Sequence, residues 1–302
     1  MIILWICAAL ILVYGGLSLY GFRIAFCADR RPKERQPTPF DEEIRAGLAW
    51  YRAQPVQEVS IRSREGLRLK GRYLPCPGSD KTILLVHGHR SVSPENDFCC
   101  ALRLYHEQMG MNLLLIDQRA QHGSEGKYLT FGVLEQLDVV DWALWLEEAH
   151  HPQVLLLDGM SMGAATVLMA LAHRLPPCVR GVIADSGYTT AGEILSHAAK
   201  SRYGVPGGLV VPCLKLLFRL ATGHSLAEAD ALRGIAKAQM PVLLLHGEGD
   251  EVVPWEMGRR LATASPRAKL VTVAGAGHGL SFLVDREKCT KALDKFIQTV
   301  LQ

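Results

Sequence analysis

The feature that most constrains the fold is the stretch 154–165, with the sequence VLLLDGMSMGAA. A short apolar run, typical of a buried strand, ends in Gly-x-Ser-x-Gly, and small, helix-prone residues follow at once. A chain can turn so sharply from strand to helix only where side chains are absent or small, as at Gly159 and Gly163. The stretch therefore predicts a strand–turn–helix unit that displays Ser161 above the N-terminus of a helix. Because the pattern is short, the rest of the chain must decide its meaning.

Continuous apolar runs recur along the chain. They cover residues 82–86, 111–116, 154–157, 179–184, 241–245 and 269–273. Strands that are buried on both faces of a parallel sheet have this composition. Helical patterns lie between the runs, most clearly at 134–148, where apolar residues recur at helical spacing. The alternation of strand and helix predicts an α/β protein with a mostly parallel, doubly wound sheet.

Residues 187–240 interrupt this alternation, because they contain no strand pattern. The interval is too long for a simple crossover and predicts a helical cap at the edge of the sheet. Within it, residues 209–221 are strongly apolar, with Lys215 and Arg219 one helical turn apart. Two interpretations of this segment remain open. It either packs against the core, or exposes an apolar face that lines a substrate entrance or touches a bilayer.

The N-terminal segment, residues 1–22, has no charged side chain and is rich in leucine and isoleucine. As a helix it would reach roughly 33 Å, enough to cross the hydrocarbon core of a bilayer. A cleaved signal peptide is the alternative, but the segment lacks a basic n-region and its apolar run is unusually long. We therefore predict a single transmembrane anchor at 1–22, a linker with a short helix at 23–54, and the main domain at 55–302.

Charge and cysteine usage bear on the location of the main domain. The basic residues near the predicted anchor all follow it, namely Arg23, Arg30, Arg31, Lys33 and Arg35. The positive-inside rule therefore predicts a cytoplasmic main domain. The eight cysteines form no CxxC pair, which favours reduced thiols over disulfides or a zinc site. A net charge of +3 and the lack of a basic, aromatic-rich stretch give no sign of nucleic-acid binding.

A serine hydroxyl is a weak nucleophile at neutral pH, so Ser161 needs a base and a group that orients the base. One apolar strand, 241–245, leads into a polar turn that carries Asp250, and another, 269–273, leads into a glycine-rich loop that carries His278. Both side chains follow the C-terminal ends of parallel strands, where open α/β sheets bind their ligands. We predict Ser161 as nucleophile, His278 as base and Asp250 as the orienting acid. Asp185, after the strand 179–184, is a rival for the acid.

An oxyanion hole is the fourth component that such a site requires. The segment 86–90, Val-His-Gly-His-Arg, follows the first buried strand, where a backbone N–H can point back toward the nucleophile. We predict the N–H groups of His89 and Met162 as the donors. Donors of this kind are typically worth ~3 kcal/mol each in transition-state stabilisation.

Taken in order, these motifs resemble those of the α/β-hydrolase-fold serine hydrolases. The chain is similar to membrane-anchored bacterial members and, more distantly, to the Bem46-like hydrolases of eukaryotes. The matching motifs are HGH at 87–89, DQRAQHGSEG at 117–126, GMSMG at 159–163, HGEGDEVVP at 246–254 and GAGH at 275–278. They span roughly residues 55–302. The resemblance implies an α/β-hydrolase fold but does not fix the substrate.

The sequence therefore predicts a membrane-anchored serine hydrolase that needs no cofactor and holds no metal. The leading hypothesis for its substrate is a carboxylic ester, such as an acyl lipid or another small hydrophobic ester. A serine peptidase of the aminopeptidase or oligopeptidase type is the alternative, since it uses the same fold and catalytic residues. A catalytically inactive, anchored scaffold is a remote third hypothesis. The sequence carries no signal for the oligomeric state.

Overall fold

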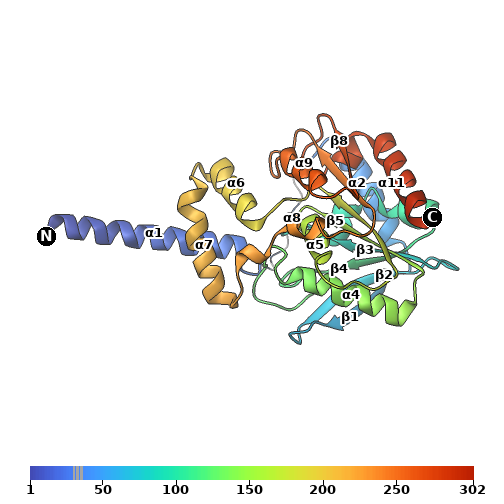
Figure 1. Ribbon diagram of the computed structural model, residues 1–302, viewed down its shortest axis with the longest axis horizontal. Helices are drawn as coiled ribbons and strands as arrows, with labels where there is room; N and C mark the ends of the chain where they lie inside the picture. Colours follow the sequence, from blue (N-terminus) through green and yellow to red (C-terminus); the bar gives the residue numbers. More distant parts are fainter. Residues whose placement is uncertain (30, 32–33, 35–36) are drawn as a thin grey trace.

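A computed structural model describes residues 1–29, 31, 34 and 37–302 (Figure 1). In the first helix, α1 (Ile2–Phe26), the side chains of residues 2–4 and 6–11 lie outside this description. The predicted anchor at 1–22 and the basic residues Arg30, Lys33 and Arg35 therefore fall partly or wholly outside the described residues. Everything that follows concerns the described part of the chain.

An eight-stranded sheet forms the centre of the molecule, with strand order β1-β2-β4-β3-β5-β6-β7-β8. β1 and β2 pair antiparallel, as do β2 and β4, and all the other pairs are parallel. The strands are β1 (Gln57–Arg62), β2 (Arg68–Leu74), β3 (Lys81–Val86), β4 (Asn112–Ile116), β5 (Val154–Met160), β6 (Val179–Asp185), β7 (Val242–Gly247) and β8 (Ala268–Val273). The predicted, mostly parallel α/β sheet is confirmed.

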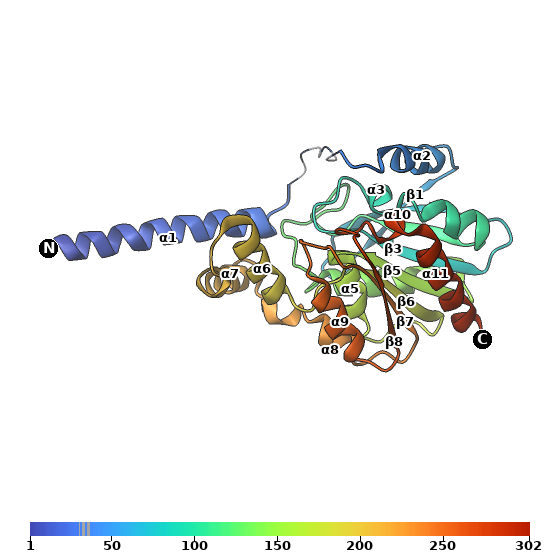
Figure 2. The same ribbon diagram turned by 90° about the horizontal axis from the view of Figure 1, so that it is seen from above.

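Helices cover both faces of the sheet (Figures 1 and 2). Along β3, Leu84 and Val86 belong to one buried cluster, while Ile83 and Leu85 belong to a second cluster. This period of two is what a strand buried on both faces requires. The first cluster includes side chains of α4 (Glu135–His150), α5 (Met162–Ala170), α8 (Ala231–Ile235) and α9 (Trp255–Thr263). The second includes side chains of α2 (Asp41–Arg52), α3 (Pro94–Phe98), the π-helix η1 (Leu104–Gln108) and α11 (Arg286–Leu301).

The interval 187–240 is helical, as the sequence predicts. It holds α6 (Ala191–Tyr203), α7 (Gly207–Thr222), the 3₁₀ helix η2 (Leu226–Glu228) and α8. α8 packs closely against α5 on the body of the domain. α6 and α7 instead pack on each other at the side of the body, and α7 also contacts α1 (Figures 1 and 2). We refer to α1, α6 and α7 together as the arm.

The end of α1 differs from the prediction of a linker that starts at residue 23. The helix continues to Phe26, whose side chain is fully buried against the rings of Phe131 and Phe218. Beyond the helix, Cys27 forms an antiparallel bridge with Tyr128. Residues 23–28 are therefore docked onto the main domain, because their aromatic and backbone groups find partners there.

Across the residues that the structure describes, we find no helix with both the length and the apolar character needed to cross a membrane.

Candidate active site

Ser161 sits in the sharp turn between β5 and α5, in a backbone conformation that residues other than glycine rarely adopt. Its φ is 56° and its ψ is −112°. The Ser161 N–H donates to the carbonyl oxygen of Asp185 on the neighbouring strand, at 2.8 Å. A strained conformation of this kind persists only where the surrounding structure imposes it. The turn holds the Ser161 hydroxyl out from the edge of the sheet.

Two glycines make this turn possible. A Cβ added to Gly163 would lie 1.8 Å from the carbonyl oxygen of Val86, and one added to Gly159 would lie 2.3 Å from the carbonyl carbon of Gly163. No side chain can occupy that space, because β3, β5 and the first turn of α5 meet there. Glycine is therefore required at positions 159 and 163 for steric reasons, as the sequence indicated.

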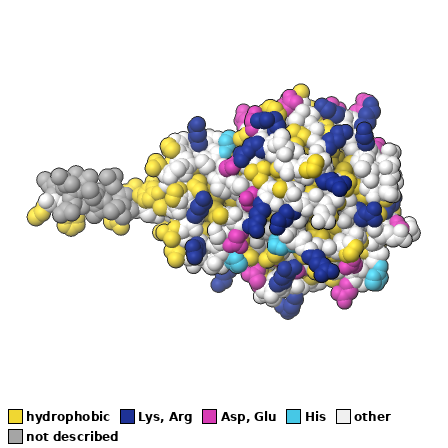
Figure 3. All heavy atoms as spheres, in the orientation of Figure 1, with side chains coloured by type: hydrophobic (Ala, Val, Ile, Leu, Met, Phe, Trp, Pro, Cys, Tyr) yellow, Lys and Arg dark blue, Asp and Glu magenta, His cyan; other side chains and the backbone are white. Residues whose placement is uncertain are grey.

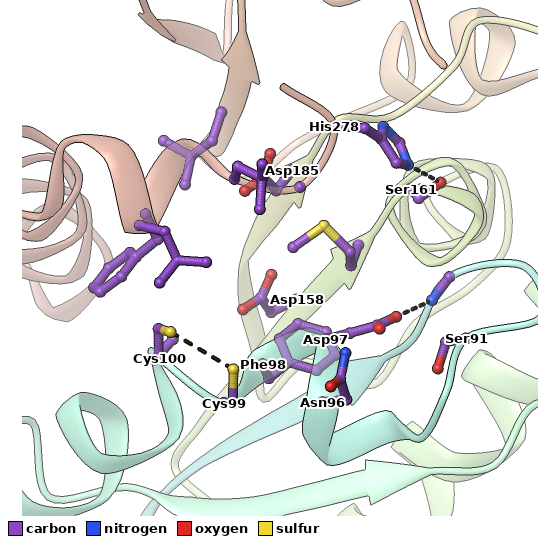
Figure 4. A pocket seen from close by; sticks show the side chains of 18 of the residues that line it. Ser91, Asn96, Asp97, Phe98, Cys99, Cys100, Asp158, Ser161, Asp185 and His278 are labelled. Carbon is purple, nitrogen blue, oxygen red and sulfur yellow. Dashed lines mark hydrogen bonds between the residues drawn. The ribbon is translucent and has the colours of Figure 1, made fainter. Parts of the chain in front are cut away.

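The structure brings the side chains of Ser161, His278 and Asp250 together in one line. Nε2 of His278 lies 2.9 Å from Oγ of Ser161 (Figure 4). On the other side of the ring, Nδ1 lies 2.7 Å from Oδ2 of Asp250. Asp250 and His278 follow β7 and β8, and because parallel strands end at one edge of the sheet, their loops meet beside the β5–α5 turn.

Asp250 is held as an anion by its surroundings. Its Oδ1 accepts hydrogen bonds from the N–H groups of Val252 (2.9 Å) and Val253 (2.8 Å). Burial alone would raise the pKa of this carboxyl, but its interactions with His246 and His278 and the Val253 N–H outweigh burial and lower the pKa below its usual range. Asp250 therefore carries the negative charge that a protonated His278 would need beside it.

Asp185, the rival acid, occupies a different position. It is buried at the end of β6, and its Oδ1 accepts a hydrogen bond from the hydroxyl of Ser186 at 3.0 Å. Burial raises the pKa of Asp185 to about 6. Since Nδ1 of His278 faces Asp250, the geometry favours Asp250 over Asp185 as the orienting acid.

The loop 87–90 is held next to the nucleophile by contacts from several segments. Position Gly88 lies against Ser161, since a Cβ added there would be 3.3 Å from the Ser161 Cβ. The Gly88 N–H donates to Asp97 (2.8 Å), and the Arg90 N–H donates to the side chain of Gln121 (2.6 Å). These contacts fix the backbone that carries the His89 N–H. The Met162 N–H belongs to the first residue of α5.

The end of α1 also supports this loop. Nε2 of His89 donates to the carbonyl oxygen of Ala25 at 2.9 Å, and the guanidinium of Arg90 donates to the carbonyl oxygen of Cys27. Neither contact could be read from the sequence, because nothing in the pattern of 23–28 or 87–90 indicates that the two segments meet. The docked end of α1 is thus part of the structure around the candidate site.

A cavity of about 290 Å³ opens beside Ser161 and His278 (Figure 4). Apolar side chains line much of it, and they come from β7, α3, α10 (Ser281–Val284) and α11, including Phe98, Leu245, Phe282 and Leu293. Among the described residues, none from 187–240 lines this cavity. The possibility that α7 lines the substrate entrance is therefore not supported.

Asp97, Asp158 and Asp185 also line the cavity (Figure 4), and of these three carboxyl groups sequence reasoning named only Asp185. Burial raises the pKa of Asp97 to about 6, that of Asp158 to about 7 and, as noted above, that of Asp185. Asp158 accepts a hydrogen bond from the Tyr105 hydroxyl at 2.9 Å. Asp158 lies three residues before Ser161 in the strand, so its position could have been inferred, whereas Asp97 reaches the site from a separate loop and helix.

Two other histidines near the site bind backbone groups of loops. His87 accepts a hydrogen bond from the Gln118 N–H (3.1 Å), and Nε2 of His246 donates to the carbonyl oxygen of Val253 (2.9 Å), so both stabilise loops. All seven cysteines whose side chains the structure describes are free.

Comparison with known proteins bears on the fold. Residues 222–300 match the α/β-hydrolase family described as TAP-like protein. The Bacillus subtilis protein YqkD is 25% identical over 244 residues, covering 80% of this chain and 78% of YqkD. The Saccharomyces cerevisiae protein YNL320W, whose name describes it as a membrane protein, is 22% identical over 215 residues, covering 71% of this chain and 70% of the yeast protein.

Among solved structures, the Pyrococcus furiosus esterase Pf2001 has a TM-score of 0.66 and 22% identity, covering 90% of this chain and 97% of the esterase. At this identity the likeness shows the fold. The chain has the α/β-hydrolase fold, as its motifs predicted, and this fold is the starting point for assigning chemistry to the site.

Proposed function

We propose that this protein is a serine hydrolase that cleaves carboxylic esters through an acyl-enzyme intermediate. The observation that carries the proposal is the unbroken series of contacts from Ser161 Oγ to His278 (2.9 Å) and from His278 to Asp250 (2.7 Å). These distances are within hydrogen-bonding range, as a nucleophile, a base and an orienting acid require. The α/β-hydrolase fold and the esterase named among its structural relatives support the same reaction class.

In the proposed mechanism, Ser161 Oγ attacks the ester carbonyl carbon while Nε2 of His278 takes the hydroxyl proton. Asp250 accepts the Nδ1–H bond and stabilises the imidazolium that forms. The tetrahedral intermediate collapses when the C–O bond to the alcohol breaks, and His278 returns the proton to the leaving alkoxide oxygen. Water, deprotonated by His278, then attacks the acyl-enzyme and releases the carboxylic acid.

We assign the oxyanion hole to the N–H groups of His89 and Met162. The loop 87–90 abuts Ser161 on one side, and α5 begins directly after it on the other, so two donors can converge on the developing oxyanion. The N-terminus of α5 adds a partial positive charge at the same place.

A hydrophobic acyl group suits the apolar part of the cavity, where Phe98, Phe282 and Leu293 provide its lining. The acids in the same cavity favour the alternative function, that of a serine peptidase. A peptidase that removes residues from an amino terminus must bind a protonated amine, and Asp97, Asp158 and Asp185 are groups that could bind one. We therefore keep both hypotheses, with ester hydrolysis first.

For location, our proposal is that α1 anchors the protein in a membrane and that the hydrolase domain is cytoplasmic. Residues 1–22 carry no charged side chain, and several described side chains on α1 are apolar and exposed, among them Trp5, Leu12 and Leu17. The basic residues follow that segment. The name of the yeast relative, a membrane protein, adds support.

A substrate panel separates the candidate functions. The full chain is assayed in detergent with p-nitrophenyl esters of increasing acyl length and with aminoacyl p-nitroanilides, beside Ser161→Ala. We expect ester turnover that Ser161→Ala abolishes. Turnover of anilides alone would replace the esterase by the peptidase, and no Ser161-dependent turnover of either class would favour an inactive scaffold.

Digestion of the main domain by protease added to intact cells would contradict the cytoplasmic location.

A further inference from the structure

The arm carries an apolar stripe that the core does not use. α7 buries Val211, Leu214 and Phe218, but its opposite side exposes 58% of Leu209, 58% of Leu216 and 74% of Leu220. Tyr203, the last residue of α6, and Val205, between α6 and α7, are also exposed. A helix of a soluble domain usually presents polar residues on the side that faces water. The exposed leucines of α7 therefore indicate that this side of the helix contacts a binding partner.

Elsewhere in the described part of the main domain, exposed large apolar side chains occur singly, as at Leu144, Val252 and Val284. Isolated side chains of this kind are normal on a protein surface, whereas a continuous stripe marks an interaction surface. Hydrophobic side chains gather at the end of the molecule from which α1 projects (Figure 3). The α7 stripe lies in this part of the surface.

The charged residues of the segment that contains the stripe are all basic. The segment 199–223 contains no acidic residue but four basic ones, namely Lys200, Arg202, Lys215 and Arg219. All four are exposed, and Lys215 and Arg219 lie on α7 among the exposed leucines. Apolar side chains flanked by basic ones match the surface of an anionic bilayer, where acyl chains lie beneath negatively charged head groups.

The orientation of α7 agrees with this partner. α7 crosses α1 at a steep angle in one view and is seen nearly end-on in the other (Figures 1 and 2). The Tyr14 hydroxyl of α1 donates to the carbonyl oxygen of Leu209 and contacts the Cys213 sulfur at 3.0 Å. If the part of α1 that precedes Tyr14 enters a bilayer along its normal, α7 therefore lies along the membrane surface, with exposed Leu12, Val13 and Leu17 of α1 nearby.

We propose that α7 is an interfacial helix that binds the surface of an anionic membrane through its leucine stripe and its basic side chains. A second copy of this chain fits the same surface less well. A symmetric pair of α7 helices would bring Lys215 and Arg219 of both copies together with no acidic residue of 199–223 to neutralise them. The inference goes beyond ester hydrolysis, and it uses the proposed α1 anchor only to orient α7.

Tryptophan placed on the stripe reports membrane contact in the full chain. Leu216→Trp is compared with Leu144→Trp, a matched change at an exposed leucine on α4, in vesicles of phosphatidylcholine with or without phosphatidylglycerol. Brominated acyl chains quench a tryptophan that lies among them. With phosphatidylglycerol, we expect the added fluorescence of Leu216→Trp to be quenched at least twofold more strongly than that of Leu144→Trp. Adding Lys215→Gln and Arg219→Gln removes most of this difference.

Two results would overturn the proposal. One is equal quenching of the Leu216→Trp and Leu144→Trp variants. The other is a blue shift of the Leu216→Trp emission that needs no vesicles and grows with protein concentration, which would identify a second copy as the occupant. Trp5→Phe tests the α1 anchor separately. It removes a native, exposed tryptophan of α1, so the quenching that this variant loses measures the contact of α1 with the acyl chains. Ester hydrolysis in detergent stays at the wild-type rate in all of these variants, so failure here is distinguishable from failure of the proposed reaction.

Discussion

The C-terminal edge of the sheet and the arm use the same kinds of residues in opposite ways. At the sheet edge, backbone and side chains are so close that a Cβ on Gly163 would lie 1.8 Å from the Val86 carbonyl oxygen. On α7, a Cβ on Gly208 would meet nothing within 4 Å. Carboxylates at the sheet edge are buried and bonded, whereas the charges on α7 are exposed. Catalytic chemistry therefore requires fixed geometry, whereas contact with a fluid surface requires only suitable composition and exposure.

Asp250 gives the largest expected effect at the sheet edge. Asp250→Asn keeps the shape of the side chain but removes the charge that stabilises protonated His278, so kcat/KM should fall about a thousandfold or more. Asp185→Asn is the matched control in the same layer, and we expect it to lower kcat/KM by less than about tenfold, because His278 does not face it. Steady-state kinetics on one ester measures both variants. A larger loss for Asp185→Asn would reverse the assignment of the acid.

Substitutions at Gly163, at the sheet edge, and Gly208, on α7, compare the two regions through the free energy of unfolding. Gly163→Ala forces a Cβ into the backbone of β3, and the variant should lose at least about 4 kcal/mol of unfolding free energy or fail to fold. Gly208→Ala places the Cβ in open space within a helix and should gain about 0.5 kcal/mol. Thermal unfolding, with soluble yield for variants that do not fold, measures both. A Gly163→Ala variant that melts within a few degrees of the wild type would contradict the packing described for this turn.

The buried carboxyl of Asp158 should make the stability of the protein depend on pH. Burial raises its pKa to about 7 in the folded protein, above the value of about 4 for an unfolded carboxyl. Between these values the folded chain holds a proton that the unfolded chain has lost, so this group's contribution to stability declines as the pH rises from 4 to 7. Asp158→Asn removes the titrating carboxyl group and keeps an oxygen that can accept the hydrogen bond from the Tyr105 hydroxyl.

Relative to the wild type, Asp158→Asn should therefore gain stability between pH 4 and pH 7, on the order of 4 kcal/mol. Chemical denaturation at the two pH values measures the change. Lys215→Gln on α7 is the control, because it replaces an exposed side chain of the arm. Parallel stability profiles for Asp158→Asn and the wild type would show that the folded protein does not retain this proton.

Much of the fold and the central residues of the site could be predicted from local patterns. Ser161, Asp250 and His278 each follow an apolar run, and parallel strands bring such positions to one edge. Gly-x-Ser-x-Gly also fixed the place of the turn, because its glycines meet a steric requirement that any chain with this geometry has. These inferences needed only the spacing of residues along the chain.

What could not be predicted depends on contacts between distant segments. The end of α1 looked like a linker because Arg23 follows an uncharged segment, but the helix continues until Phe26 is buried against Phe131 and Phe218. Asp97 lies in a short helix after β3, and only the tertiary structure shows that it binds the Gly88 N–H beside the nucleophile. Sequence spacing contains no information about either contact.

The measurement that tests the central claim most directly is covalent labelling with a fluorophosphonate, followed by mass spectrometry of the digested protein. This reagent phosphonylates an activated serine, so the labelled residue identifies the nucleophile. We predict one adduct per chain, on the peptide that contains Ser161, and none on Ser161→Ala, while Ser201→Ala, an exposed serine on α6, labels like the wild type. The absence of an adduct on folded wild-type protein, or an adduct on another serine, would contradict the account.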